Sequence, residues 1–228
     1  MRSMIEINKK LQETHFFSEN DLNSLLNVQK LRKKKDNVGV IKVPNKKTNA
    51  FEKLATTRNF GGGKVDIDEI LRIIYECFRI KNDKNTHNYS LGHRTFPTAG
   101  GLNSSELYVY VRSDNILFKY NPYSNTMSII SNRFNIKKLI PYPGNIKLEN
   151  ISALFLFTLD LRPLDVKYGV RGLKYGLLEI GHSAQNVCIQ ATKHKLGYCS
   201  IGFFDDSYFI KIVKENYITL QYLIAIGQ

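Results

Sequence analysis

Cysteine is scarce in this sequence. The three cysteines, Cys77, Cys188 and Cys199, are an odd number, show no CxxC spacing and have no His or Cys nearby at metal-ligand spacing. This pattern excludes a disulfide scaffold and argues against a structural zinc site. We therefore expect reduced, mostly buried thiols in a cytoplasmic protein, with no metal site.

Long hydrophobic runs and common catalytic signatures are missing too. No apolar run approaches the roughly 18–20 residues that a helix needs to span a bilayer, and Met1 to Glu6 lack the apolar stretch of a secretory signal. Gly61 to Lys64 lack the GxxxxGK(S/T) spacing of a phosphate loop and predict a plain turn. The motifs GxSxG, HExxH and HxE…PCxxC do not occur. We expect no membrane partner, and common hydrolase or zinc deaminase chemistry has no support.

What the chain does have is a core and an excess of positive charge. Hydrophobic residues make up 43% of the 228 residues and charged residues 23%, so a real core is available. The net charge is +13, and residues 1–64 hold 14 Lys and Arg against 6 Asp and Glu. Such a segment can bind phosphate backbones, attract an acidic peptide or simply be a solvated face. No nucleic-acid motif accompanies it, so nucleic acid is not the expected partner.

The pattern divides the chain into two parts. Residues 1–50 are expected to form a basic helical appendage with a linker, and residues 51–228 a single domain. Leucines at helical spacing predict a helix over residues 22–31, which ends near the basic run Lys30–Lys35. Residues 36–57 are polar with scattered Pro and Asn, and we interpret them as a linker or loosely ordered arm.

Residues 51–228 follow an α+β pattern. The elements expected in chain order are a helix over 66–78, a polar loop over 80–93, a hairpin of strands 106–111 and 115–120, a strand over 151–159 buried on both faces, a long helix over 170–196, a strand over 198–203, a helix starting at 205 and a last strand over 218–226.

The long helix is the most informative of these elements. Between Tyr175 and Thr192 its one formally charged residue is Glu179. A helix that is hydrophobic nearly all round lies in the centre of a core or in a subunit interface. Small residues at Gly172, Gly176, Gly181 and Ala184 would let another backbone approach it closely.

Two short segments are candidates for chemistry. Arg94-Thr95-Phe96-Pro97-Thr98-Ala99-Gly100-Gly101 crowds small residues after a proline with an arginine beside them. This composition suits a loop whose backbone N–H groups approach a flat or anionic ligand, although an ordinary turn has the same composition. Lys167-Tyr168 precede the long helix. If desolvation or their mutual interaction activated one of them, it could act as a base; otherwise they are ordinary surface residues.

Four groups of residues occur in a fixed order along the chain. They are Arg94–Gly101 leading into Glu106-Leu107-Tyr108, then Lys167-Tyr168 with Arg171-Gly172, then Leu178-Glu179-Ile180-Gly181-His182 with Gln185-Asn186, and finally Leu196-Gly197 and Ser200-Ile201-Gly202 followed by Asp205-Asp206. This series resembles the SagB-type dehydrogenase branch of the FMN-dependent nitroreductase superfamily, over about residues 54–227. The Lys-Tyr pair followed by Arg-Gly is most similar to the azoline-oxidising dehydrogenases of thiazole/oxazole-modified peptide biosynthesis, the microcin B type included.

The resemblance implies a nitroreductase-like α+β fold with an antiparallel central sheet flanked by helices, a long buried central helix, and a homodimer with FMN at the subunit interface. It implies that flavin is contacted by a Ser-x-Arg position, a loop and a later strand, and that the Lys-Tyr pair is the catalytic base. The matching cofactor-binding residues are Thr56 and Arg58, then Arg94, Pro97, Thr98, Ala99, Gly100 and Gly101, then Ser200, Ile201 and Gly202; the catalytic residues are Lys167 and Tyr168. Glu179, His182 and Asn186 fit the helix signature as structural supports.

This chain departs from the family pattern at three places. Leu54 and Ala55 stand where paired arginines usually precede Ser-x-Arg, so the flavin phosphate must find cations elsewhere. Ser104-Ser105 replace a proline before the strand glutamate. The sequence stops at Gln228, without the basic C-terminal extension that many nitroreductases use on the phosphate.

The function implied is oxidation of thiazoline or oxazoline rings in a ribosomal peptide, by proton abstraction and hydride transfer to flavin N5. The implied partners are a peptide substrate, whose acidic leader the basic arm would attract, and a cyclodehydratase or synthetase complex. Two alternatives remain open from the sequence. One is a generic NAD(P)H-dependent nitroreductase of the same fold, and the other is a non-catalytic basic scaffold with a degenerate flavin fold.

Overall fold

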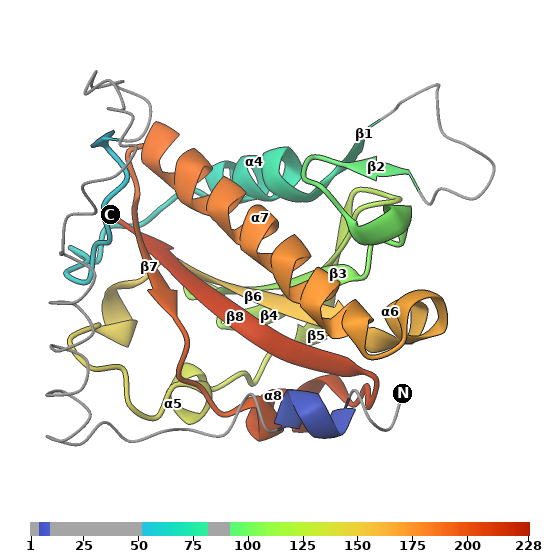
Figure 1. Ribbon diagram of the computed structural model, residues 1–228. Helices are drawn as coiled ribbons and strands as arrows, with labels where there is room; N and C mark the ends of the chain where they lie inside the picture. Colours follow the sequence, from blue (N-terminus) through green and yellow to red (C-terminus); the bar gives the residue numbers. More distant parts are fainter. Residues whose placement is uncertain (1–4, 10–51, 82–91) are drawn as a thin grey trace, which may run out of the picture.

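The computed structural model describes residues 5–9, 52–81 and 92–228 (Figure 1). The helix predicted over 22–31 and most of the predicted linker lie outside the described residues. Residues 5–9 form a helical turn, and Asn8 is held to the sheet because Gln221 Nε2 donates to its side-chain oxygen at 2.8 Å.

The centre of the fold is a six-stranded antiparallel sheet. Its spatial order is β5-β4-β3-β6-β8-β7. The strands are β3 (Ser105–Val111), β4 (Ile116–Asn121), β5 (Thr126–Ser131), β6 (Ala153–Asp160), β7 (Gly197–Ile201) and β8 (Ile218–Gly227). The predicted hairpin and the three other predicted strands are confirmed, and β5 is an additional strand at the edge of the sheet.

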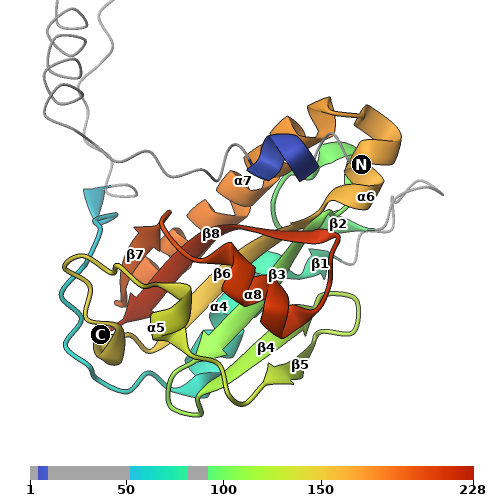
Figure 2. The same cartoon turned by 90° about the horizontal axis from the view of Figure 1, so that it is seen from below.

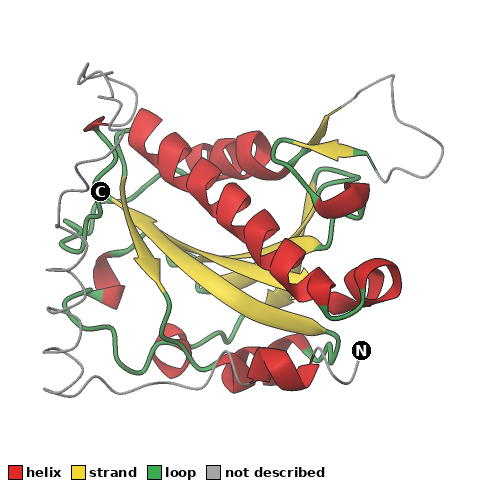
Figure 3. Ribbon diagram, viewed as in Figure 1, coloured by secondary structure: helices red, strands yellow, loops and turns green. Residues whose placement is uncertain are grey.

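Helices cover both faces of this sheet (Figure 3). The helices α4 (Ile67–Phe78) and α7 (Arg171–Lys193) cross one face, and α5 (Ile136–Leu139) and α8 (Asp206–Val213) lie on the other (Figure 2). Two hydrophobic clusters fill the two layers, and β6 contributes to both: Phe155 and Phe157 to one, Leu154 and Leu156 to the other. Alternate side chains of a strand point to opposite faces, so the nearly all-apolar run predicted to be buried on both faces is so buried.

The predicted helix boundaries hold because capping residues fix them. Asp66 begins α4, and its side chain accepts from Asp68 N at 3.1 Å. Asp205 begins α8, and its side chain accepts from Tyr208 N at 3.0 Å. The hydrogen bond from the Ser207 hydroxyl, with those from backbone N–H groups, lowers the pKa of Asp205 and so favours the charged cap.

The region over residues 80–93 differs from the predicted polar loop. Its two ends pair as β1 (Ile80–Lys81) and β2 (His93–Arg94), a two-stranded antiparallel sheet. The residues between them lie outside the described part of the chain. The paired ends bring Arg94 back beside the C-terminal end of α4, at the start of the candidate loop.

The long helix is buried on one face of the protomer. Gly172 lies where an added Cβ would be 2.6 Å from the Leu164 carbonyl oxygen, so the short helix α6 (Leu161–Tyr168) packs backbone-close to α7. Val170, just before the helix, is 49% exposed, and Leu177 and Leu178 are 38% and 53% exposed. The helix therefore packs into the core on one face, and its exposed apolar residues are of the kind found at interfaces.

Two further sequence expectations can be compared with the structure. Cys77, Cys188 and Cys199 are free and buried, as predicted. Burial raises the pKa of Cys188 to about 11, so its thiol stays protonated at neutral pH. Within the described residues, no helix combines the length and apolarity of a membrane crossing, and no cluster of metal-ligating side chains occurs.

Candidate functional site

The loop over Pro97–Gly101 has a backbone conformation that requires glycine. Gly100 and Gly101 have φ of 59° and 70°, the left-handed region that favours glycine. A Cβ added at Gly100 would lie 2.5 Å from Lys167 Nζ and would collide with the Tyr168 hydroxyl. Glycine is therefore required at this position both by the backbone conformation and by the side chains packed against it.

The buried side chain of Glu179 anchors this loop from α7. Its carboxylate is 1% exposed and accepts from Ala99 N at 3.2 Å and from Ser105 N at 2.9 Å. Asn186, seven residues further along the helix, donates to Thr95 O at 3.4 Å. Hydrogen bonds from two backbone N–H groups offset the desolvation of the carboxylate. The helix signature thus holds the loop from both of its ends, whereas His182 is exposed.

The Lys167–Tyr168 pair lies against the same loop. It ends α6 immediately before Gly169, where the chain turns into α7. Lys167 Nζ donates to Gly100 O at 3.4 Å and lies 5.5 Å from the centre of the Tyr168 ring. The Tyr168 ring packs edge-on against Tyr175 at 5.0 Å between centroids. The structure therefore brings both predicted catalytic side chains to the predicted cofactor loop.

Arg94 has a supporting position at the stem of the loop. It is 4% exposed, and its terminal nitrogens donate to Phe78 O at 2.9 Å and to Ser105 O at 3.3 Å. Burial lowers the pKa of Arg94 below its ordinary value. These bonds tie the end of α4 to the beginning of β3. A direct contact of Arg94 with flavin stays a prediction.

The remaining predicted cofactor residues follow β7. Thr56 forms an isolated parallel bridge to Tyr198, and Thr57 N donates to Tyr198 O at 2.8 Å, which places Thr56 and Arg58 beside this strand. Ser200 and Gly202 are exposed, and Ile201 is buried. A Cβ added at Gly202 would meet nothing within 4 Å. Ser200 also lines a cavity of about 350 Å³ between α7, β7 and β8.

The predicted site residues fall into two groups, which lie on different elements of the protomer. The loop group (Pro97–Gly101 with Lys167 and Tyr168) lies at the N-terminal half of α7, and the strand group (Thr56, Arg58 and Ser200–Gly202) lies along β7, which follows its C-terminal end (Figure 1). Ser200 shares a cavity with Leu177 and Ile180 of α7, whereas the loop group is bonded to the neighbouring Glu179 of the same helix.

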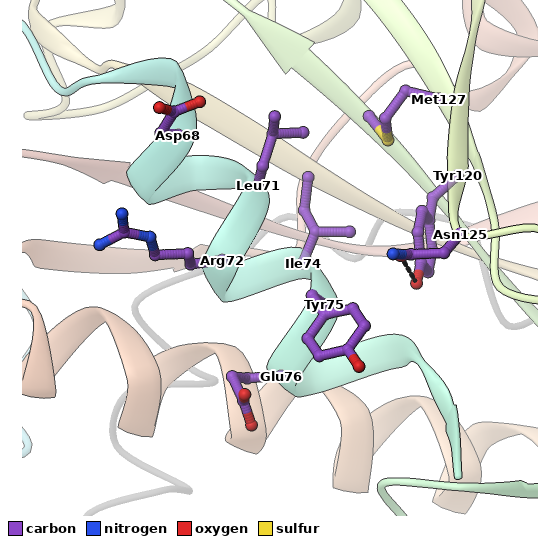
Figure 4. Close-up of a pocket in the computed structure, with 9 residues that line it drawn as sticks. All are labelled: Asp68, Leu71, Arg72, Ile74, Tyr75, Glu76, Tyr120, Asn125 and Met127. Atoms are coloured by element: carbon purple, nitrogen blue, oxygen red, sulfur yellow. Dashed lines mark hydrogen bonds between the residues drawn. The ribbon is translucent and has the colours of Figure 1, made fainter. Parts of the chain in front are cut away.

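Another cavity, of about 360 Å³, lies between α4 and the β4–β5 hairpin (Figure 4). Leu71 and Ile74 of α4 face Met127, and Tyr75 points toward Tyr120 (Figure 4). The Tyr120 hydroxyl is already bonded to the Asn125 side chain at 2.9 Å. None of the predicted site residues lines this cavity, and we do not assign a role to it.

Comparisons with known proteins identify the family and the fold. Residues 55–228 match the pattern of the nitroreductase family. Protein MJ1384 of Methanocaldococcus jannaschii, a nitroreductase by name, is 24% identical over 167 residues, which cover 71% of this chain and 81% of that protein.

Solved structures share the fold. A chain of the E. coli microcin synthetase McbBCD complex, solved with truncated pro-MccB17 bound, superposes with a TM-score of 0.74 at 17% identity, over 100% of this chain and 94% of that chain. An FMN-dependent nitroreductase of Clostridium difficile superposes with a TM-score of 0.50 at 17% identity, over 79% and 86% of the two chains. The family match spans most of the described domain, and the antiparallel sheet between helical layers is shared with these structures. The chain therefore belongs to the nitroreductase family, a family of flavin-dependent oxidoreductases.

Proposed function

We propose that this chain is an FMN-dependent dehydrogenase of the SagB type, which oxidises thiazoline or oxazoline rings of a ribosomal peptide to thiazole or oxazole. The observation that carries the proposal is the contact of Lys167 and Tyr168 with the glycine loop at Gly100. Two titratable side chains held against a glycine loop would place a proton-transfer group next to a flat cofactor, as this reaction requires.

The residues that could hold a flavin form two groups, each of which could contact one part of it. At Gly100 the glycine loop is in contact with the Lys167 and Tyr168 side chains, and at Gly202 the protomer leaves open space where a side chain would stand. The exposed apolar face of Leu177 and Leu178 lies on the helix between them. We propose a two-fold dimer in which the loop group of one protomer and the strand group of its partner hold one FMN. Arg58 would be the cation of the strand group nearest the phosphate.

The chemistry divides between cofactor and protein. When bound, the flavin supplies the hydride acceptor that no side chain provides. Lys167 or Tyr168 removes the proton from the neighbouring ring carbon, and the bond from Lys167 to Gly100 fixes where that base stands relative to the loop. Positioned general bases contribute about 10²–10⁴-fold to rate. Glu179 keeps the loop in place without touching the substrate.

A peptide substrate and synthetase partners are supported by the likeness to a chain of the microcin synthetase complex, which was solved with a peptide bound. We propose that this chain likewise acts on a peptide within or beside a cyclodehydratase complex. The basic residues 1–50 would attract an acidic leader by long-range electrostatics. Deleting them should then weaken processing of the peptide at low ionic strength more than at high ionic strength.

A generic nitroreductase is the second candidate, favoured by the names of the Methanocaldococcus jannaschii and Clostridium difficile proteins. The two candidates differ in their electron donor. A nitroreductase accepts electrons from NAD(P)H, so its flavin is bleached rapidly when NAD(P)H is added. The proposed dehydrogenase takes electrons from the heterocycle and has no need of a nicotinamide site.

The visible spectrum of the purified protein tests the cofactor assignment. We expect a yellow protein with a flavin spectrum, from which FMN is released on denaturation. A thiazoline-bearing peptide added without oxygen should bleach the bound flavin, whereas NAD(P)H should do so slowly. A colourless protein that also fails to take up added FMN would overturn the flavin assignment, and rapid bleaching by NAD(P)H alone would favour the nitroreductase.

A further inference from the structure

A separate cavity lies behind the stem of the candidate loop. It has a volume of about 430 Å³ and is enclosed by the start of β3, the β4–β5 hairpin and the first turn of α6. Arg94 and Ser104 line it together with Leu102, Tyr123 and Pro163. Volumes of this size are typical of sites that bind small ligands or short peptide segments.

Two buried polar groups, on residues that line this cavity, have no partner in the described part of the chain. They are the Ser104 hydroxyl oxygen and the Arg94 Nε–H, on side chains of residues that are 2% and 4% exposed. Buried polar groups in native proteins are nearly always hydrogen-bonded, and an unmet one destabilises the fold unless a ligand or water meets it. Both groups can donate, so they require an acceptor oxygen.

The charges around the cavity are already paired. Lys119 lies 2.9 Å from Glu106 and 3.3 Å from Glu215, and Asp160 lies 2.6 Å from Arg162. Burial disfavours the Lys119 ammonium, but the hydrogen bond and charge of Glu106 outweigh this, so the pKa of Lys119 is raised. These ion pairs contain three carboxylates and two cations, and the third carboxylate balances the charge of Arg94. The cavity therefore has no surplus of positive charge that would select an anion.

The ligand chemistry follows from these groups. A neutral amide offers a carbonyl oxygen to Arg94 Nε and Ser104 Oγ, and an N–H to the carboxylates of Glu106 or Asp160 on the same cavity wall. Proline and tyrosine side chains supply apolar walls for the atoms between the amides. We infer that this cavity binds a neutral, uncharged stretch of polypeptide through its backbone amides.

This inference deepens the proposed function, on which it rests for the identity of the peptide as substrate. Leu102 directly follows the candidate loop, and Pro163 belongs to α6, which carries Lys167 and Tyr168. A peptide held here contacts both elements that build the loop group. It would hold residues that flank the reacting heterocycle, while the heterocycle itself lies at the front of the loop.

The test is an NMR titration of the full ¹⁵N-labelled chain with the blocked neutral peptide acetyl-tetraalanine-amide, and separately with acetate. The blocked peptide should shift the backbone signals of Leu102, Ser104 and Tyr123, and acetate should not. Ser104→Ala should weaken peptide binding by roughly 3- to 10-fold. It should also raise the midpoint of thermal unfolding, because an unpartnered buried hydroxyl is removed.

Two further variants keep the result interpretable. The Ser105 hydroxyl is also buried and unpartnered within the described residues, but Ser105 does not line the cavity. Ser105→Ala should therefore leave peptide affinity unchanged. Ser128 is exposed on the edge strand and lines the cavity, so Ser128→Trp should fill the cavity and abolish binding while the sheet is retained.

Each outcome has one meaning for the inference. Preferential binding of acetate, no binding of either probe, or peptide binding that survives Ser128→Trp overturns it. The readout is independent of turnover and of colour. A yellow protein that binds no peptide here refutes the cavity assignment alone, and a colourless protein that binds the peptide refutes the flavin assignment alone.

Discussion

Lys167→Ala and Tyr168→Phe are each expected to lower the rate of heterocycle oxidation by about 10²–10⁴-fold, the usual contribution of a general base, while the bound flavin is retained. The reason is geometric: both side chains reach Gly100, but neither is part of the loop backbone. The assay follows conversion of a thiazoline-bearing peptide by mass, and the visible spectrum of the same samples reports flavin content.

Matched variants separate loss of the base from loss of charge or of a ring. Lys174 is exposed on α7, and Tyr142 is 74% exposed in the segment before β6. Lys174→Ala and Tyr142→Phe should keep at least most of the wild-type turnover. If both Lys167→Ala and Tyr168→Phe also turn over normally with their colour intact, the pair has no part in the reaction.

Glu179→Ala is expected to lower the free energy of unfolding by about 2–5 kcal/mol, the range for losing a buried hydrogen-bonded side chain, and to release flavin. The substitution leaves the N–H groups of Ala99 and Ser105 without an acceptor and opens a cavity where the carboxylate stood. Glu179→Gln should be intermediate, because an amide has one oxygen to accept with and presents an NH₂ group to the other donor. Urea denaturation measures the stability, and the flavin absorbance of the dialysed protein measures cofactor retention.

The control for this prediction is a glutamate in a helix without buried partners. Glu76 is exposed on α4, so Glu76→Ala should change the free energy of unfolding by less than about 0.5 kcal/mol. Equal stability of Glu179→Ala and wild type would show that the two backbone bonds do not hold the loop.

The sheet and its main helices could be predicted from the sequence because their patterns are strong and local. The alternating hairpin sequence predicted the strands β3 and β4, although β3 is buried at nearly every position, and the apolar run predicted β6, which is buried on both faces. The strand β5 was missed because its burial pattern is weak: it lies at the sheet edge with Ile129 64% exposed. The helix α6 was missed because its short, mixed sequence contains Pro163 within its first turn, which is compatible with a helix start but does not predict one.

The candidate site was predictable only in pieces. The sequence singled out Pro97–Gly101 and Lys167-Tyr168, but nothing in it indicated that Lys167 would reach Gly100 across 67 positions. Likewise, the resemblance placed both the loop group and the strand group at one cofactor, whereas in the structure they are two groups that reach α7 from different elements. Such long-range relations depend on the packing of α6, α7 and β7, and no local pattern encodes that packing.

The sharing of one flavin between two protomers is the central claim, and a mixed dimer tests it most directly. Gly100→Val disrupts the loop group, where φ is positive and neighbours are close, and Gly202→Val intrudes into space that is open in the protomer. Each variant alone should lose flavin. The dimer of one Gly100→Val and one Gly202→Val chain, isolated with two affinity tags after co-expression, should retain about half the wild-type flavin, because one of its two symmetric sites is intact. A mixed dimer as colourless as its parents would show that each site is built within a single chain and would contradict the account.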